Sequence, residues 1–390
     1  MTTHPNPSFV SVAASAAFAL GFAGSVAAAN VEIYGLVETG LNYSHVDADD
    51  GNGSASKFEQ RAGQFIPSRW GLRGTEELDN GMRVGFNLEG QFALDTGEMT
   101  GGRLFQRTAQ LWVGGPYGEL LLGRSGLLRS GFGTTGIWGA KVNPFSSSVG
   151  QYISGSKYIF PGDFKAADNT ITYRTPDMNG LRLHAQFSGK MDQAKYPNVE
   201  EFEGGADRNW GIGATYTKGA LHLAAVLDSI MYGKDAGYKY AEDFDDSLGL
   251  SLAAVYDFGL LKLYTSAMWF DGMLGSKFQG HQFGTTNSVD QTATYKGYGL
   301  QIGSDVPAFG GTFKVNLGWM DAKVDEKALE TSAAEETDRI SVSTGYVYPL
   351  SKRTNAYVAA GYMRDSFNDG RNADTTPQAY EVMIGMWHRF

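Results

Sequence analysis

Apolar and polar residues alternate along most of the chain with a period of two. In residues 31–43 the odd positions are mostly apolar, while the even positions carry Glu32, Glu38 and Asn42. The same alternation returns in residues 181–188, 221–228, 313–319 and 380–390. No helical stripe of comparable length accompanies it. A period of two is typical of β-strands, so the pattern predicts an all-β fold.

Short turn signals separate these strands in pairs, and longer polar stretches join one pair to the next. Seven tight turns join fourteen strands, and the first and last strands raise the expected number to sixteen. The turns are Asp79-Asn80-Gly81, Gly114-Gly115-Pro116, Asp177-Met178-Asn179-Gly180, Lys218-Gly219, Asp257-Phe258-Gly259, Phe309-Gly310-Gly311 and Pro349-Leu350-Ser351-Lys352. The long connections are residues 44–63, 93–103, 125–168, 191–208, 230–247, 271–294, 322–337 and 364–377. Short periplasmic turns opposite long extracellular loops predict a transmembrane antiparallel β-barrel.

A soluble protein built of β-sandwiches is the alternative, because its strands would alternate in the same way. The positions that alternate with the apolar ones, however, carry Gly, Ser, Thr, Arg and Glu on strand after strand, with no second set of hydrophobic faces. A sandwich must bury its apolar faces against each other, whereas a barrel can turn them toward lipid. The pattern therefore favours one barrel domain over residues 30–390.

The first 29 residues have a different character. Residues 9–29 are the only apolar run close to the length of a membrane helix, and they end in Ala27-Ala28-Ala29 before Asn30. This A-x-A ending predicts a signal peptide, residues 1–29, cleaved after Ala29. An uncleaved anchor is the alternative, since the leading residues contain no Lys or Arg.

Composition narrows the chemistry. The chain has no Cys, so disulfides and thiolate sites are excluded. No phosphate-binding loop, metalloprotease motif, nucleophile elbow or metal cluster of His residues is present, and we expect neither catalysis nor a cofactor nor a metal. The pI near 5.1 argues against nucleic-acid binding. Three expected loops, 191–208, 230–247 and 322–337, hold fifteen acids and six bases, which supplies −9 of the net charge of −10.

At this point the chain resembles the general, non-specific porins of Gram-negative outer membranes, most closely the beta-proteobacterial type. The matching segments, in order, are Ile33-Tyr34-Gly35 with Glu38, Ser68-Arg69-Trp70-Gly71-Leu72-Arg73-Gly74-Thr75-Glu76-Glu77-Leu78, Phe92 through Gly97, Arg103-Leu104-Phe105 with Arg107, Gly118 through Arg124, Asn169 through Pro176, Leu350 through Thr354, and His388-Arg389-Phe390. The resemblance implies a sixteen-stranded barrel in the outer membrane, a homotrimer in contact with lipid and lipopolysaccharide, and passive diffusion of small polar solutes. It also implies that the third loop folds into the lumen, and that Phe390 is the signal read by the barrel-assembly machinery.

The resemblance further implies that arginines on the wall face charged groups on the third loop. Parity places Arg69, Arg73 and Arg174 on the inner side, Arg107 with less support, and Glu38 inward as well. We take these five residues as candidates for the wall of the constriction, because charge lining a narrow channel selects ions by sign. The alternative for each arginine is an ordinary ion pair with a neighbouring acid.

The expected third loop, residues 125–168, is poor in acids. Arg129, Lys141 and Lys157 are its only charged residues before Asp163, and Asp168 follows near the return to the barrel. A loop of this composition in the lumen predicts a net positive constriction, with the two aspartates restoring part of the negative wall. The loop is also rich in aromatic residues, which either pack it against the wall or form a track for sugars: Trp138, Phe145, Tyr152, Tyr158 and Phe160.

Together these features predict a water-filled channel for small hydrophilic solutes and ions, with a bias toward anions. A substrate-selective channel for phosphate, dicarboxylate or sugar is the first alternative. A non-conducting structural or adhesive barrel, or a barrel enzyme, is the second.

Overall fold

A computed structural model describes residues 30–147, 149–153, 155–235, 245–278, 293–327, 335–368 and 374–390. The predicted signal peptide, residues 1–29, lies outside these ranges, as do parts of the acidic stretches 230–247 and 322–337. No helix within the described ranges is long and apolar enough to cross a membrane.

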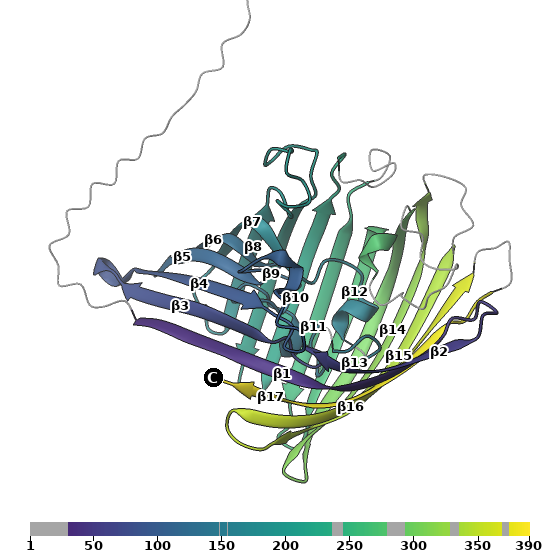
Figure 1. Cartoon of the computed structure of the whole chain (residues 1–390). Coiled ribbons are helices and arrows are strands. Elements are labelled where there is room, and N and C mark those ends of the chain that lie inside the picture. Colours follow the sequence, from purple (N-terminus) through teal and green to yellow (C-terminus); the bar gives the residue numbers. More distant parts are fainter. Residues whose placement is uncertain are drawn as a thin grey trace, which may run out of the picture.

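The described residues form seventeen strands in one antiparallel sheet that closes on itself, because β1 pairs with β17 (Figure 1). The strands are β1 (Asn30–Asp47), β2 (Ser54–Ala62), β3 (Arg69–Glu77), β4 (Arg83–Gln91), β5 (Thr108–Gly115), β6 (Gly118–Gly126), β7 (Ala166–Arg174), β8 (Leu181–Ser188), β9 (Arg208–Lys218), β10 (Leu221–Met231), β11 (Leu248–Asp257), β12 (Lys262–Leu274), β13 (Ala293–Ala308), β14 (Gly311–Lys327), β15 (Glu336–Pro349), β16 (Thr354–Asn368) and β17 (Gln378–Arg389). One short α-helix, α1 (Ser156–Ile159), and a 3-10 turn at Gly139–Lys141 lie between β6 and β7 in the described part of the chain. The all-β barrel predicted from the alternation is therefore confirmed.

All seven predicted tight turns join neighbouring strands. The first, at Asp79–Gly81, is a 3-10 turn between β3 and β4 in which Asn80 adopts a left-handed conformation (φ 65°). The last, at residues 350–353, joins β15 to β16. The turns hold antiparallel partners in register, which is why the alternation continues from strand to strand.

The second strand of the barrel is divided, and this accounts for the count of seventeen. Strand β1 pairs through residues 39–47 with β2 and through residues 30–36 with β3, so β2 and β3 occupy one position in the barrel. The barrel thus has the sixteen positions predicted and one extra strand. The prediction of a long loop over residues 44–63 was wrong, because β1 and β2 extend into it and pair up to Asp47 and Ser54.

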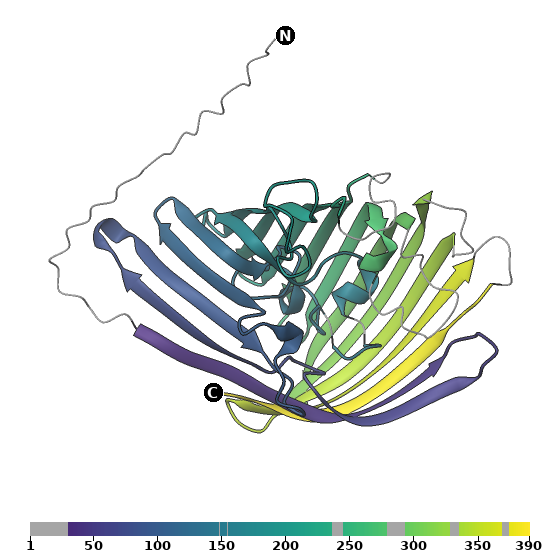
Figure 2. The same ribbon diagram turned by 45° about the horizontal axis from the view of Figure 1, so that its top comes forward.

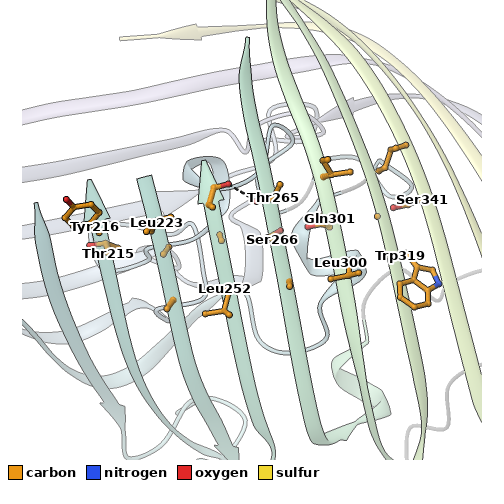
Figure 3. A pocket seen from close by; sticks show the side chains of 18 of the residues that line it. Thr215, Tyr216, Leu223, Leu252, Thr265, Ser266, Leu300, Gln301, Trp319 and Ser341 are labelled. Carbon is orange, nitrogen blue, oxygen red and sulfur yellow. Dashed lines mark hydrogen bonds between the residues drawn. The ribbon is translucent and has the colours of Figure 1, made fainter. Parts of the chain in front are cut away.

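Side chains alternate across the wall as the sequence predicts. Ile33 and Ile384 point outward and are 68% and 58% exposed, whereas Asn42 and Glu381 point inward and are buried. On the outer face of β9–β15, Leu223, Leu252, Leu300 and Trp319 line a shallow apolar hollow (Figure 3). Such a face meets lipid in a transmembrane barrel.

The inner face contains more apolar residues than the sequence suggested. Val226, Val255, Met268 and Phe270 lie on the inner side of β10–β12 and belong to the main buried cluster. This cluster also holds residues from the connection between β6 and β7, residues 127–165, which lies inside the ring of strands (Figure 2). The expectation of no second hydrophobic face was therefore wrong: the face exists, and the third loop covers it.

Candidate functional site: the charged lumen and its inner loop

Two ion pairs that are almost completely buried hold the third loop: one joins the loop to the wall, and the other lies within the wall beside the loop. Arg129, at the start of the loop, pairs with Asp228 of β10 and donates a hydrogen bond to the carbonyl oxygen of Pro161 (2.9 Å). Arg339 of β15 donates twice to the carboxylate of Asp365 (2.6 Å each). Arg129 was predicted to charge the constriction, but its side chain is 2% exposed and its charge is balanced by Asp228.

The same buried groups also bind the main chain of the loop. Arg339 donates to the carbonyl oxygen of Tyr158 in α1 (2.9 Å). Glu381 of β17 accepts hydrogen bonds from the backbone N–H groups of Gln151 (2.7 Å) and Tyr152 (2.8 Å). Asn42 donates to the other carboxylate oxygen of Glu381 at 2.5 Å. Hydrogen bonds to charged groups are stronger than neutral ones, so these contacts fix the path of the loop.

The aromatic residues of the third loop pack it against the wall. Trp138, Phe145, Tyr152, Tyr158 and Phe160 are all buried, with at most 5% of each residue exposed. Phe145 joins a cluster with Tyr357 and Trp387 of the inner wall. The packing interpretation is confirmed, and a sugar track on these rings is contradicted because their faces are covered.

Two of the predicted wall arginines share one carboxylate. Arg107, directly before β5, donates through Nε to Glu89 of β4 (2.5 Å) and through Nη1 to Gln91 (3.0 Å). Arg69 of β3 places its Nε 3.7 Å from the same Glu89. The ring of Phe132, a loop residue, lies 4.3 Å from the guanidinium of Arg107.

A second carboxylate is shared in the same way. Arg174 of β7 donates through Nε to Glu119 of β6 (2.7 Å) and through Nη1 to the carbonyl oxygen of Thr134 in the loop (3.2 Å). Arg83 of β4 lies 4.0 Å from Glu119. Arg69, Arg107 and Arg174 are therefore all inner-wall residues. Arg107 and Arg174 contact the third loop, and Arg69 lies beside Glu89, which also binds Arg107.

The remaining two wall candidates have other surroundings. Arg73 is half exposed and pairs with Glu32 of β1 (2.7 Å) while lying over the ring of Tyr34. Glu38 points inward as predicted, but it is only 1% exposed, because residues 63–68 cover it. Glu38 consequently adds no exposed negative charge to the lumen, which corrects its predicted place on the pore wall.

Lys141 and Lys157 are the loop cations for which no ion pair is found within the described ranges. Lys141 is exposed and donates to the carbonyl oxygen of Gly136 (3.1 Å). Lys157 lies 4.8 Å from the ring of Tyr158. Burial, with a smaller effect from the charge of Arg61, lowers the pKa of Lys157 to about 8.

The two loop aspartates are paired rather than free to face the lumen. Lys277 donates to Asp163 (3.0 Å), and Lys165 lies 3.5 Å away. Burial by itself raises the pKa of Asp163, but these two positive charges outweigh it and hold the pKa below its usual range. Asp168 belongs to β7 and is clamped by Arg103 (2.7 Å) and Arg124 (2.5 Å). Their expected contribution to a negative wall is therefore offset.

Phe390 closes the barrel at its last residue. Its N–H donates to the carbonyl oxygen of Gly35, and its own carbonyl oxygen accepts from the N–H of Gly35, both at 3.1 Å. The ring is about half exposed on the outer face.

Several inner charges were given no role at the level of sequence: Arg61, Arg83, Glu119, Arg339 and Glu381. Parity within their strands was the available signal for Arg83 and Glu119. Arg61 was missed because residues 44–63 were assigned to a loop. No group of three or more His, Asp or Glu that could bind a metal ion occurs among the described residues.

Comparison with known proteins agrees with this architecture. The family model described as Gram-negative porin matches residues 13–368. An outer membrane porin protein of Bordetella pertussis is 31% identical over 96% of this chain and 98% of its own. The anion-selective porin from Comamonas acidovorans has a TM-score of 0.61 and 22% identity, over 93% of this chain and 100% of that chain. The trimer form of OmpT from Vibrio cholerae has a TM-score of 0.60 and 13% identity, over the same shares of the two chains.

The family match covers most of the chain, and the fold is that of solved porins. The chain therefore belongs to the Gram-negative porin family, as an outer-membrane β-barrel and not an enzyme.

Proposed function

We propose that this porin forms a water-filled channel through which small hydrophilic solutes and ions diffuse passively, with a bias toward anions. One observation carries the bias: two carboxylates of the inner wall are each shared by two arginines. Glu89 lies beside Arg69 and Arg107, and Glu119 lies beside Arg174 and Arg83. Each group of three keeps a surplus positive charge.

The third loop adds to this surplus. Residues 125–162 contain no acid, and Lys141 and Lys157 remain after Arg129 has paired with Asp228. Fixed charge in a channel with low-dielectric walls concentrates ions of the opposite sign. The anion selectivity of the structurally similar Comamonas porin is consistent with this proposal.

We also propose that the protein is exported, assembled and trimerised in the manner of the porin family. The mature protein begins at Asn30, forms a homotrimer embedded in lipid and lipopolysaccharide, and is recognised by the barrel-assembly machinery through its C-terminal strand. The trimer form of the OmpT neighbour and the barrel fold support this assembly.

The zero-current reversal potential in a planar bilayer under a KCl gradient tests the proposed selectivity. We expect anion preference in the parent protein and a decrease of about two- to threefold in the anion-to-cation permeability ratio for Arg174→Ala. That factor corresponds to about 0.5 kcal/mol, which is typical of a partly screened charge. The substitution also leaves Glu119 without its nearest cation.

Arg364→Ala is the matched control, because Arg364 is exposed on the outer side of β16 and the net charge changes equally. Cation preference in the parent protein would overturn the anion bias. Conductance that saturates with one solute would indicate a substrate-selective channel instead, and a membrane without conductance would indicate a closed barrel.

A further inference from the structure

Six residues of the divided strand, Gly63–Ser68, form a bulge into the lumen. The last pair of β2 with β1 is Ala62 with Thr39, and the first pair of β3 with β1 is Arg69 with Leu36. Only Val37 and Glu38 of β1 lie between these pairs, so six residues face two. A bulge of this size is larger than the single extra residue of an ordinary β-bulge.

Glu38 attaches the bulge to the wall. Its carboxylate accepts hydrogen bonds from the N–H of Gln64 (3.0 Å) and from the hydroxyl of Tyr357. Its own N–H donates to Oγ of Ser68 (2.9 Å). The side chain of Gln64 donates to the Tyr357 hydroxyl at 2.8 Å. Gln64 and Ser68 of the bulge are thus bound to Glu38, one of the two residues that the bulge faces, and Gln64 is also bound to Tyr357 of β16.

The bulge in turn contacts the tip of the third loop, residues 149–153. The carbonyl oxygen of Gln64 accepts a hydrogen bond from the N–H of Gly150 (2.7 Å). Phe65 stacks on Trp387 of the wall with ring centroids 5.3 Å apart. Phe65 and Ile66 also pack on a buried cluster that contains Val149 of the tip.

We propose that Gly63–Ser68 is a positioning element for the channel: it fixes the distance between the tip of the third loop and the wall, and Glu38 acts through it. Gln151, the next residue of the tip, is exposed inside the ring of strands, so the tip borders the water-filled part of the lumen. The position of the tip then limits the cross-section available to a solute. This proposal concerns pore size and holds for either sign of ion selectivity.

Deleting Gln64–Pro67 tests the proposal without disturbing the register. After the deletion Gly63 would face Glu38 and Ser68 would face Val37, which joins β2 to β3 as one regular strand. Each remaining side chain keeps its inward or outward direction, because the deletion removes an even number of residues. We expect a larger single-channel conductance and faster passage of solutes near the size limit.

A thiol at the tip reports its position directly. The chain has no Cys, and Val149 is 2% exposed, so Val149→Cys introduces a single protected thiol. We expect labelling by a water-soluble thiol reagent to be at least about tenfold faster in the deletion variant. Loss of one hydrogen bond and one packed side chain costs more than ~1.4 kcal/mol of local stability, which corresponds to a factor of ten.

Phe65→Ala is a second, milder variant in case the deletion does not assemble. Its matched control is Phe58→Ala in β2, whose ring is 69% exposed. We expect thiol labelling to be faster for Phe65→Ala than for the parent protein. The labelling rate of the control should equal that of the parent. If conductance and labelling stay at parental values in both the deletion and Phe65→Ala, the positioning role is wrong, although the channel itself stands. A parent protein without conductance would contradict the proposed channel, while the labelling result would still decide where the tip is held.

Discussion

Charged side chains inside the barrel fall into two groups at the scale of single residues. Arg129, Arg339 and Asp365 are buried in ion pairs and hold the third loop in place. Lys141 and Lys157 lie on the loop, and no carboxylate pairs with them within the described ranges. The first group contributes to stability. The second group adds to the field that we propose for the surplus arginines beside Glu89 and Glu119, because only an uncompensated charge attracts counter-ions over a distance.

The charge of Lys157 should make the anion preference depend on pH. Its pKa is lowered from 10.5 to about 8, chiefly by burial, so the amine is charged below that pH and neutral above it. Raising the pH from about 7 to about 9 crosses this value and should weaken anion preference. Reversal potentials at the two pH values measure the effect.

The variant Lys157→Met is the control for this prediction. It should show weaker anion preference at the lower pH and a smaller change between the two pH values. An unchanged pH response in Lys157→Met would show that Lys157 does not contribute.

Removing one member of the Arg339–Asp365 pair should destabilise the barrel strongly. Arg339→Met leaves the buried carboxylate of Asp365 without its cation, which typically costs about 3–5 kcal/mol. The double variant Arg339→Met/Asp365→Leu should recover much of this loss, because no buried charge remains. Denaturant titration of the protein in detergent or lipid measures the free energy of unfolding. A double variant less stable than the single one would contradict this explanation.

At the scale of elements, two features of β1 organise the barrel. Its second half pairs with β17 on one side and β2 on the other, so β1 closes the sheet. Its residues Val37 and Glu38 face the bulge that contacts the third loop. Closure and positioning of the loop therefore depend on the same strand.

Phe390 should act in assembly through both its ring and its main chain. Phe390→Ala keeps the two backbone hydrogen bonds to Gly35 but removes the ring, whereas deletion of the residue removes both. We expect less folded barrel in the outer membrane for the alanine variant and less again for the deletion. Heat-modifiable migration on gels measures the folded fraction. Equal parental yields in both variants would rule out an assembly role for this residue.

At the scale of the whole molecule, the net charge of −10 is opposite in sign to the positive constriction that we propose. Stretches 191–208, 230–247 and 322–337 hold fifteen of the 42 acids and only six bases, whereas arginines outnumber the acid beside Glu89 and beside Glu119 on the inner wall. Global charge therefore does not determine ion selectivity, since screening confines each charge to roughly 8–10 Å at physiological ionic strength.

The exported protein should begin at Asn30. Strand β1 starts at that residue, so cleavage after Ala29 frees the strand for pairing without leaving an apolar tail at the barrel. Mass spectrometry of protein isolated from outer membranes should give the mass of residues 30–390. A mass that includes residues 9–29 would instead indicate the uncleaved anchor.

Much of the barrel could be predicted from local patterns. Alternation in residues such as Ile33, Glu38 and Asn42 assigns each side chain to one face, and the seven turns give the pairing of neighbours. The inward orientation of Arg69 and Arg174 followed from the same parity. The bulge escaped prediction because Gly63–Ser68 has no repeat, and parity cannot be followed across it.

The sequence by itself determined the class of fold, the face of residues in the strands with clear alternation and the acid-poor composition of the third loop, because these depend on residues close together in the chain. The tertiary structure decided which charges remain uncompensated. Arg129 meets Asp228, Asp168 meets Arg124, and Glu38 is covered by the bulge; these partners lie 99, 44 and 26 residues apart in the sequence. Whether a charge faces water or a partner depends on the path of the third loop, which only packing inside the closed barrel determines.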